Sequence, residues 1–162
     1  MNDHGGKRSR SYGRLELVCD VLGAVCLLLM ILLTALYWDR LPARIPTHFG
    51  FDGQPTAWGG RSAILLLPGV GLILCVVLTL VRFLPDRLYN YPVPVTEENR
   101  ERLGVLAREL LSVLKAGLLL AFLPLLIFLL KGLSLPLWYL PLLLLLVFGP
   151  IVFYTIRMVK NK

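Results

Sequence analysis

The stretch "VLGAVCLLLMILLTALYW", residues 21–38, decides the fold because it carries no charged side chain. A helix needs roughly 20 such residues to cross the hydrocarbon core of a bilayer. Three more uncharged runs follow, at 62–81, 116–130 and 132–156. With 57% hydrophobic and 17% charged residues, the chain has more apolar surface than a soluble domain of this size can bury. We therefore predict four transmembrane spans.

The spans are expected to be helices. Isolated strands would leave backbone N–H and C=O groups unpaired in hydrocarbon, and the runs lack the alternation of a barrel strand. The third run is the shortest, and we expect Lys115 and Lys131 on either side of it to extend their aliphatic stems to the lipid headgroups. The predicted class is an all-α, polytopic membrane protein.

The distribution of lysine and arginine predicts the orientation. Thirteen of the 17 such residues lie in the N-terminal tail, between Arg82 and Lys115, or in the tail from Arg157, whereas four lie on the other side. The positive-inside rule then places both termini in the cytoplasm. Attraction of this basic face to anionic lipid explains the net charge of +7, so no nucleic-acid partner is expected.

These features divide the chain into eight successive segments. They are a basic cytoplasmic tail at 1–14, a first span at 15–38, an extracytoplasmic loop at 39–61, a second span at 62–84, a cytoplasmic segment with an amphipathic helix at 85–111, a third span at 112–131, a fourth span at 134–156 and a basic cytoplasmic tail at 157–162. The first span ends at Tyr37 and Trp38 without a small-residue cleavage site, so we expect an uncleaved helix rather than a signal peptide.

Few polar or reactive side chains lie in the spans. Glu16 and Asp20 are four residues apart on one helical face, and carboxylates inside membranes often mark a cation or proton site. We favour the simpler interpretation that both meet water at the cytoplasmic end. Cys19, Cys26 and Cys75 have no partners of disulfide or metal-ligand spacing, so we interpret them as small packing residues.

The prolines of the spans predict bends. Pro68, in "LPGVG", removes a backbone hydrogen bond and is expected to kink the second span. Pro124, Pro136, Pro141 and Pro150 interrupt the last two spans, which we interpret as packing and bending rather than as a transporter site. The turn around "KGLSLP" predicts a tight antiparallel pairing of these two spans.

The segment before the third span predicts a helix. Thr96 can cap it, Glu97 and Glu98 suit its positive dipole end, and Glu98 can pair with Arg102. Its leucines recur at intervals of three and four residues, so one face is apolar. That face either rests on the inner leaflet or a partner, or packs on the bundle; we favour the second.

The outer loop at 39–61 is longer than a helix hairpin requires. Prolines stiffen it, "FDGQP" is a strong turn signal and its aromatic residues can anchor it, so we predict an ordered cap. His48 and Asp52 are the only side chains there suited to acid–base or metal chemistry, and they are too few for a metal site. No catalytic residue, metal or cofactor is predicted.

Two stretches carry a resemblance, "LPARIPTHFGFDGQPTAWG" at 41–59 and "YNYPVPVTEENRERLGVLARELLSVLK" at 89–115. Together they resemble the bacterial multipass membrane family of unknown function that forms the N-terminal part of SdpI-type toxin-immunity proteins. SdpI-type chains continue with further membrane helices, whereas six residues follow Ile156 here. With the residue patterns above, the resemblance indicates an outer ligand-binding set of Pro42, Ile45, Pro46, His48, Phe49, Asp52, Gly53, Pro55 and Trp58 and a cytoplasmic relay set of Asn90, Pro92, Thr96, Glu97 and Asn99.

The resemblance implies protection against a secreted peptide toxin and signalling to a cytoplasmic regulator, at a bacterial plasma membrane. Our first hypothesis is therefore a non-enzymatic protein whose outer loop recognises a peptide or an envelope component. The alternative is a small transporter that uses Glu16 and Asp20, or an accessory subunit of a membrane complex, since proline- and glycine-containing helices also suit oligomer packing. The expected surroundings are the lipid bilayer in either case.

Overall fold

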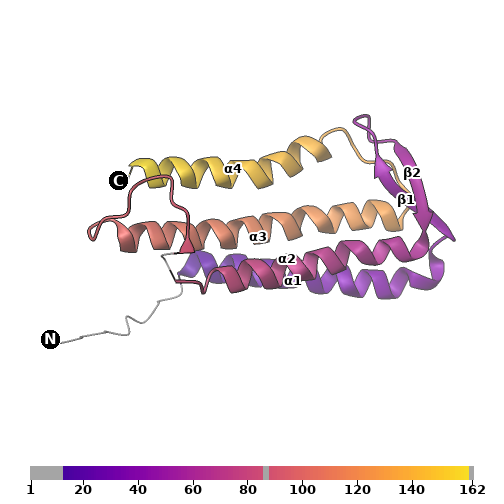
Figure 1. Cartoon of the computed structure of the whole chain (residues 1–162). Coiled ribbons are helices and arrows are strands. Elements are labelled where there is room, and N and C mark those ends of the chain that lie inside the picture. The colour runs from indigo at the N-terminus through magenta and orange to yellow at the C-terminus, as the bar shows by residue number, and fades with distance from the viewer. Residues whose placement is uncertain (1–12, 86–87, 161–162) are drawn as a thin grey trace.

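Four long helices make up most of the protein. The computed structural model describes residues 13–85 and 88–160 and contains α1 (Arg14–Tyr37), α2 (Leu66–Val81), α3 (Arg100–Leu130) and α4 (Tyr139–Lys160). With the short 3₁₀ turns beside α1 and α2, all four are long and apolar enough to cross a membrane. The predicted all-α, polytopic class is confirmed, and the protein is a multipass membrane protein (Figure 1).

The helices alternate in direction along the bundle. The basic end, which holds Arg14, Arg82, Arg100 and Lys160, contains the starts of α1 and α3 and the last turns of α2 and α4 (Figure 1). The opposite end holds the connection between α1 and α2, and we call it the hairpin end. α3 packs against the other three helices, whereas α4 makes its main contacts with α3. α3 is therefore the central helix.

Leu119 of α3 is the point where three helices meet. Its side chain is fully buried, and its two methyl groups lie against Gly23 of α1 and Gly71 of α2. A Cβ built on either glycine would come within 3.2 Å of a Leu119 methyl carbon, so both helices can approach this closely because a side chain is missing. Cys26 and Leu27 complete this buried cluster, and the half-buried Cys75 packs against it.

A β-hairpin covers the hairpin end. Between the 3₁₀ turns η1 (Trp38–Arg40) and η2 (Arg61–Leu65), the chain forms β1 (Arg44–Phe49) and β2 (Pro55–Gly60), which pair antiparallel with an irregular register around His48. The sequence predicts an ordered cap here but does not predict strands. Proline and paired glycines are unfavourable within strands, and regular alternation is absent from this stretch.

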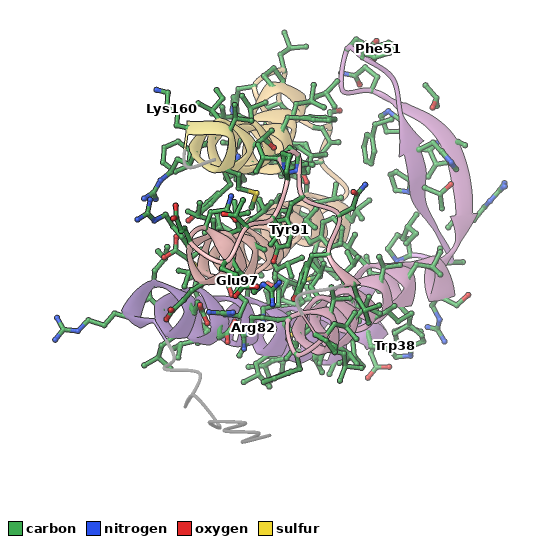
Figure 2. The ribbon with its side chains drawn as sticks, turned by 60° about the vertical axis from the view of Figure 1, so that its left-hand side comes forward. Trp38, Phe51, Arg82, Tyr91, Glu97 and Lys160 are labelled. Atoms are coloured by element: carbon green, nitrogen blue, oxygen red, sulfur yellow. The ribbon has the colours of Figure 1, made fainter. Side chains whose placement is uncertain are left out.

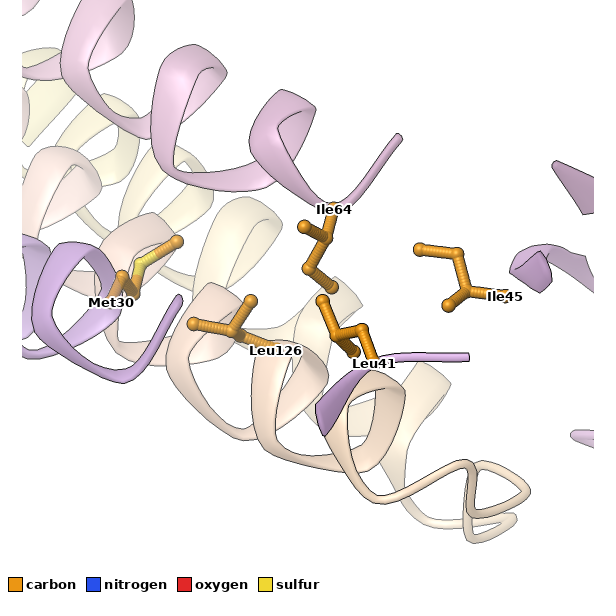
Figure 3. Packing of buried hydrophobic residues seen from close by; sticks show 5 residues of the cluster. All are labelled: Met30, Leu41, Ile45, Ile64 and Leu126. Atoms are coloured by element: carbon orange, nitrogen blue, oxygen red, sulfur yellow. The ribbon is translucent and has the colours of Figure 1, made fainter. Parts of the chain in front are cut away.

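The base of the hairpin is seated in the core. Ile45 of β1 is 1% exposed and joins Leu41, Ile64, Met30 of α1 and Leu126 of α3 in one buried cluster (Figure 3). Burying a residue of this size is worth roughly 2 kcal/mol relative to leaving it in water. The hairpin therefore packs directly onto the helices, which explains why the loop is ordered.

The tip of the hairpin is tied to the connection between α3 and α4. The backbone N–H of Leu135 donates to the carbonyl of Gly53 at 2.9 Å, and the Ser134 hydroxyl donates to the side-chain oxygen of Gln54 at 3.0 Å. The Asp52 carboxylate accepts from the backbone N–H of Gln54 and so holds the turn. The hairpin thus bridges α1 and α2 to the start of α4.

Three local expectations differ from the structure. α4 begins at Tyr139 rather than at 134, and residues 131–138 form a longer connection than the predicted tight turn. Pro68 lies in the first turn of α2, directly after η2, rather than in the interior of the α-helix. Lys115 is 4% exposed inside the bundle, so the prediction that it reaches the headgroups is wrong.

The predicted amphipathic helix does continue into the third span, as α3. It begins at Arg100, and its Leu103, Leu106 and Ala107 are buried against Tyr154 and Met158 of α4. This bears out the packing of the apolar face on the bundle rather than on a separate partner.

Gly53→Ala is expected to lower the thermal unfolding midpoint more than Gly132→Ala. Both glycines have positive φ, at 74° and 63°, which costs an alanine about 1 kcal/mol. At Gly53 the added Cβ would also meet the carbonyl oxygen of Leu135, whereas nothing lies near Gly132. Thermal unfolding of both purified variants in one detergent measures the difference. Equal midpoints would show that the contact between the hairpin tip and residue 135 does not stabilise the fold.

Candidate functional site

A cavity of about 420 Å³ lies between the hairpin and the α3–α4 pair. Its walls come from β1 and the following turn, from α3, and from the connection and first turns that lead into α4. The lining residues are Thr47, His48, Phe49, Gly50, Phe51, Gly53, Leu125, Leu135, Pro136, Leu137, Tyr139, Leu140 and Leu143. We call this space the hairpin cavity.

The hairpin cavity has a mainly apolar lining with a few polar side chains. Tyr139 is buried and donates its hydroxyl proton to the carbonyl of Ala121 at 2.9 Å, so its polar atom is satisfied within the protein. Thr47 and His48 are exposed and offer a hydroxyl and an imidazole at the rim. A mainly apolar lining with a few polar groups is typical of ligand sites.

Two strongly exposed apolar side chains also belong to the lining of the hairpin cavity. Phe51, at the hairpin tip, is 93% exposed, and Leu137 is 72% exposed in the connection before α4 (Figure 2). Exposed apolar residues on a lipid-facing helix need no partner other than lipid, but these two lie on the connections at the end of the bundle. Both are accessible from outside the protein at this cavity.

The structure divides the predicted outer set of residues. His48, Phe49 and Gly53 line the hairpin cavity, while Ile45 is a core residue and Asp52 holds the turn. The remaining members lie outside the cavity lining: Pro42 is exposed, Pro46 is buried and opposite Trp58 in the register, Pro55 begins β2, and Trp58 is 54% exposed.

The other half of the cavity comes from residues that the motif did not indicate. Leu125 is in α3, and Leu135 to Leu143 lead into and through the first turns of α4. Leucines within apolar spans look alike in sequence, so no local pattern separates these from lipid-facing ones. In the sequence, Pro136 and Pro141 indicate that the start of the fourth span is irregular, and this could have pointed to the residues there.

Two members of the predicted relay set line a second cavity, at the basic end. It measures about 390 Å³ and lies between the segment at 89–92, the last turn of α2, α3 and the last turns of α4. Asn90 and Pro92 are in its lining, with Thr155 and Met158 of α4 opposite. Tyr89 donates its hydroxyl proton to the carbonyl of Val81 at 2.8 Å, which fixes this segment to the end of α2.

The other relay residues shape the entry into α3. The Thr96 N–H donates to the side-chain oxygen of Asn99 at 2.8 Å, and the Asn99 N–H donates back to the Thr96 hydroxyl at 3.3 Å. This reciprocal pair is a capping box, which satisfies amide groups that the helix start leaves open. Asn99 is 5% exposed and also donates to the carbonyl of Pro94, whereas Glu97 is exposed and pairs with Arg100.

Glu16 and Asp20 belong to a buried charge cluster, which corrects the expectation that both face water. The Asp20 carboxylate lies 2.9 Å from Arg82 and 2.7 Å from Lys115, and Glu16, at 4% exposed, lies 3.9 Å from Arg108. Figure 2 shows Arg82 within the bundle. The full cluster comprises Glu16 and Asp20 of α1, Thr79 and Arg82 at the end of α2, and Arg108, Ser112 and Lys115 of α3.

Two cations of the charge cluster, Arg82 and Lys115, also donate hydrogen bonds to hydroxyl groups. Arg82 donates to Ser112 at 2.9 Å as well as to Asp20, and Lys115 donates to Thr79 at 2.8 Å as well as facing Asp20. A buried charge is costly unless it is both paired and hydrogen-bonded, and Arg82 and Lys115 are both. The cluster therefore joins three helices at the basic end.

Asp20→Ala is expected to destabilise the protein by about 3–5 kcal/mol, because it leaves Arg82 and Lys115 buried beside each other without their carboxylate. Lys115→Met added to Asp20→Ala should recover part of the loss. Glu97→Gln removes an exposed ion pair and should change little, which makes it the control. Thermal unfolding in detergent measures all three. An Asp20→Ala midpoint equal to that of Glu97→Gln would show that the cluster does not hold the bundle together.

Comparison with known proteins covers the hairpin and the two helices around it. Residues 25–72 match the family model described as "Domain of unknown function (DUF1648)". An uncharacterised protein of Archaeoglobus fulgidus is 35% identical over 72 residues, which are 44% of this chain and 39% of that protein, so the match spans well under half of the relative's length. No solved structure matches. From the middle of α1 to the first half of α2, the chain is thus similar to a domain of unknown function.

Proposed function

We propose that this multipass membrane protein is a non-enzymatic binding protein, and that its hairpin cavity recognises an extended peptide through an apolar side chain. The observation that carries the proposal is the cavity of about 420 Å³ that motif residues His48, Phe49 and Gly53 share with α3 and α4. This volume falls within the range of natural ligand sites. The role that fits is SdpI-like immunity or signalling, as the resemblance of the two quoted stretches implies.

A peptide suits the cavity better than a compact solute. The hairpin is a sheet of two strands, so each strand has an outer edge on which an extended chain can form main-chain hydrogen bonds. β1 forms one wall of the cavity over Thr47, His48 and Phe49. A peptide lying along this wall could place one apolar side chain between α3 and α4, and the backbone contacts and the cavity would act together.

Helix α4 offers a route from the outer site to the other side. Its first turns line the hairpin cavity through Tyr139, Leu140 and Leu143, and its last turns line the cavity that contains Asn90 and Pro92. α4 makes its main contacts with α3 alone, so it can shift without unpacking α1 and α2. A ligand would transmit its presence only if it binds one position of α4 more tightly than another.

The orientation that serves this role has the hairpin outside and both termini in the cytoplasm of a bacterial plasma membrane. The excess of lysine and arginine at the basic end supports it, since thirteen of the 17 such residues lie in segments on that side. A secreted peptide would then meet the hairpin cavity first. The regulator would meet the second cavity.

The alternative of a small transporter rests on Glu16 and Asp20. In the structure both carboxylates lie beside cationic side chains, Arg82, Arg108 and Lys115, and none of these residues lines the cavities described above. Carboxylates that are already compensated by protein cations suit helix packing better than transient ion binding. We therefore prefer the binding role.

His48→Ala with Phe49→Ala is expected to abolish protection of a sensitive bacterial host against its secreted peptide toxin, because both residues line the cavity. Leu140→Trp, which fills the cavity from α4, should have the same effect. Thr56→Ala is the matched control, since Thr56 is exposed on β2 and outside the cavity lining. Survival of cells expressing each variant at equal membrane levels is the measurement. Full protection by both cavity variants would exclude this cavity as the recognition site.

A cysteine at Phe51 should react with a membrane-impermeant maleimide in intact cells, whereas a cysteine at Leu88 should react only after the membrane is opened. Phe51 is 93% and Leu88 61% exposed, and they lie at opposite ends of the bundle. Cys19 and Cys26 are buried and Cys75 is half-buried, and a Cys75→Ser background removes the most accessible natural thiol. The reverse labelling pattern would invert the proposed orientation.

A further inference from the structure

We propose that the hairpin end contains a phospholipid site, separate from the hairpin cavity, in which one acyl chain lies between α1 and α2 and the phosphate meets arginines at the base of the hairpin. The acyl chain would occupy a groove of about 440 Å³. Its lining comes from the last turns of α1 and the start of the second span: Ile31, Thr34, Ala35, Trp38, Leu65 and Pro68. This proposal does not depend on the proposed peptide-binding function.

The groove is apolar throughout and faces the bilayer. The Thr34 hydroxyl donates to the carbonyl of Met30 at 2.8 Å, so the one polar side chain among the aliphatic ones is satisfied within its own helix. Ile31, at 47% exposed, and Leu65, at 49% exposed, lie on the rim, while the small Ala35 leaves the space open between them. An acyl chain fits such a lining because it needs no polar contact along its length.

Trp38 marks the level at which the lipid chain would end and its headgroup would begin. Tryptophan favours the boundary between hydrocarbon and headgroups, and here it forms part of the groove wall at the end of α1. The guanidinium of Arg61 lies over the Trp38 ring at 5.2 Å from its centroid, and that of Arg40 lies over Tyr37 at 5.7 Å. The Arg61 guanidinium thus lies over one wall of the apolar groove, and Arg40 follows Trp38 in η1.

Arg44, the first residue of β1, is a third arginine at the base of the hairpin. Arg44 of β1 is opposite Gly60 in the register, and the Arg61 N–H donates to the carbonyl of Ala43 at 3.1 Å. Within residues 13–85 and 88–160, none of Arg40, Arg44 and Arg61 forms an ion pair with a carboxylate. Three exposed arginines at the base of the hairpin, one of which lies over the groove wall at Trp38, complement a phosphate diester attached to an acyl chain. A phospholipid supplies both parts in one molecule.

An anionic phospholipid should bind this site more tightly than a zwitterionic one. The test is native mass spectrometry of the full-length protein, delipidated in detergent and titrated with phosphatidylglycerol or phosphatidylcholine. Arg61→Gln should weaken phosphatidylglycerol binding about tenfold, the effect of losing one charge-assisted contact, while Arg61→Lys should keep part of it. Ala35→Phe should fill the groove, so that phosphatidylglycerol no longer binds more tightly than phosphatidylcholine.

Two matched control variants distinguish lipid binding at this site from non-specific lipid binding elsewhere on the helices. Ala24→Phe adds the same side chain at an exposed position nearer the basic end of α1, and Arg157→Gln removes a cation from the last turn of α4. Both should bind phosphatidylglycerol like the unchanged protein. Inorganic phosphate and a soluble glycerophosphate without acyl chains should fail to compete at concentrations equal to that of the lipid.

Three results would overturn the proposal. If Arg61→Gln and Ala35→Phe both bind phosphatidylglycerol normally, the lipid is held only non-specifically around the helices. If soluble phosphate competes fully and Ala35→Phe has no effect, the arginines bind an anion without its acyl chain. If Ala35→Phe lowers the dimer fraction but not lipid binding, the groove is an interface between two copies of this chain.

Discussion

The ion pairs of Asp20 are the interaction on which the arrangement of the helices depends. A carboxylate at this depth in the bundle must be compensated, and its partners, Arg82 and Lys115, come from two other helices. Helix packing in a membrane lacks the hydrophobic driving force that operates in water, so polar contacts of this kind set which helices meet and at what height. Asp20 therefore aligns α1, the end of α2 and α3 at the basic end, and Leu119 packs against Gly23 and Gly71 nearer the middle.

The hairpin provides the corresponding constraint at the other end. Ile45 seats its base in a core formed with α1, η2 and α3, and Gly53 ties its tip to Leu135. Between these two attachments the strand β1 is held away from α4 far enough to leave the hairpin cavity. The same geometry places Arg61 over Trp38 in the wall of the groove between α1 and α2, with Arg40 and Arg44 in the adjoining segments η1 and β1. The hairpin thus lines the hairpin cavity, and its base adjoins the groove between α1 and α2.

α4 differs from the other helices because it depends on α3 for most of its contacts. It carries none of the residues of the charge cluster, and each of its ends lines a cavity. A three-helix unit fixed by ion pairs, with a fourth helix held mainly by apolar packing, is the arrangement in which a small ligand can favour one position of one helix. The proposed binding and relay role rests on this distribution of contacts more than on any single residue.

The amino-acid sequence alone determined that this is a helical protein with four spans, because length and hydrophobicity are local properties that the bilayer reads segment by segment. It also predicted that the loop at 39–61 is ordered and that His48, Phe49 and Gly53 belong to an outer ligand-binding set. Only the tertiary structure decided that Lys115 turns inward to Asp20, that Ile45 is core while His48 faces a cavity, and that leucines of α3 and α4 complete the site. These outcomes depend on which residues far apart in the chain come together. The local sequence around a leucine or a lysine does not indicate which distant residue it will contact.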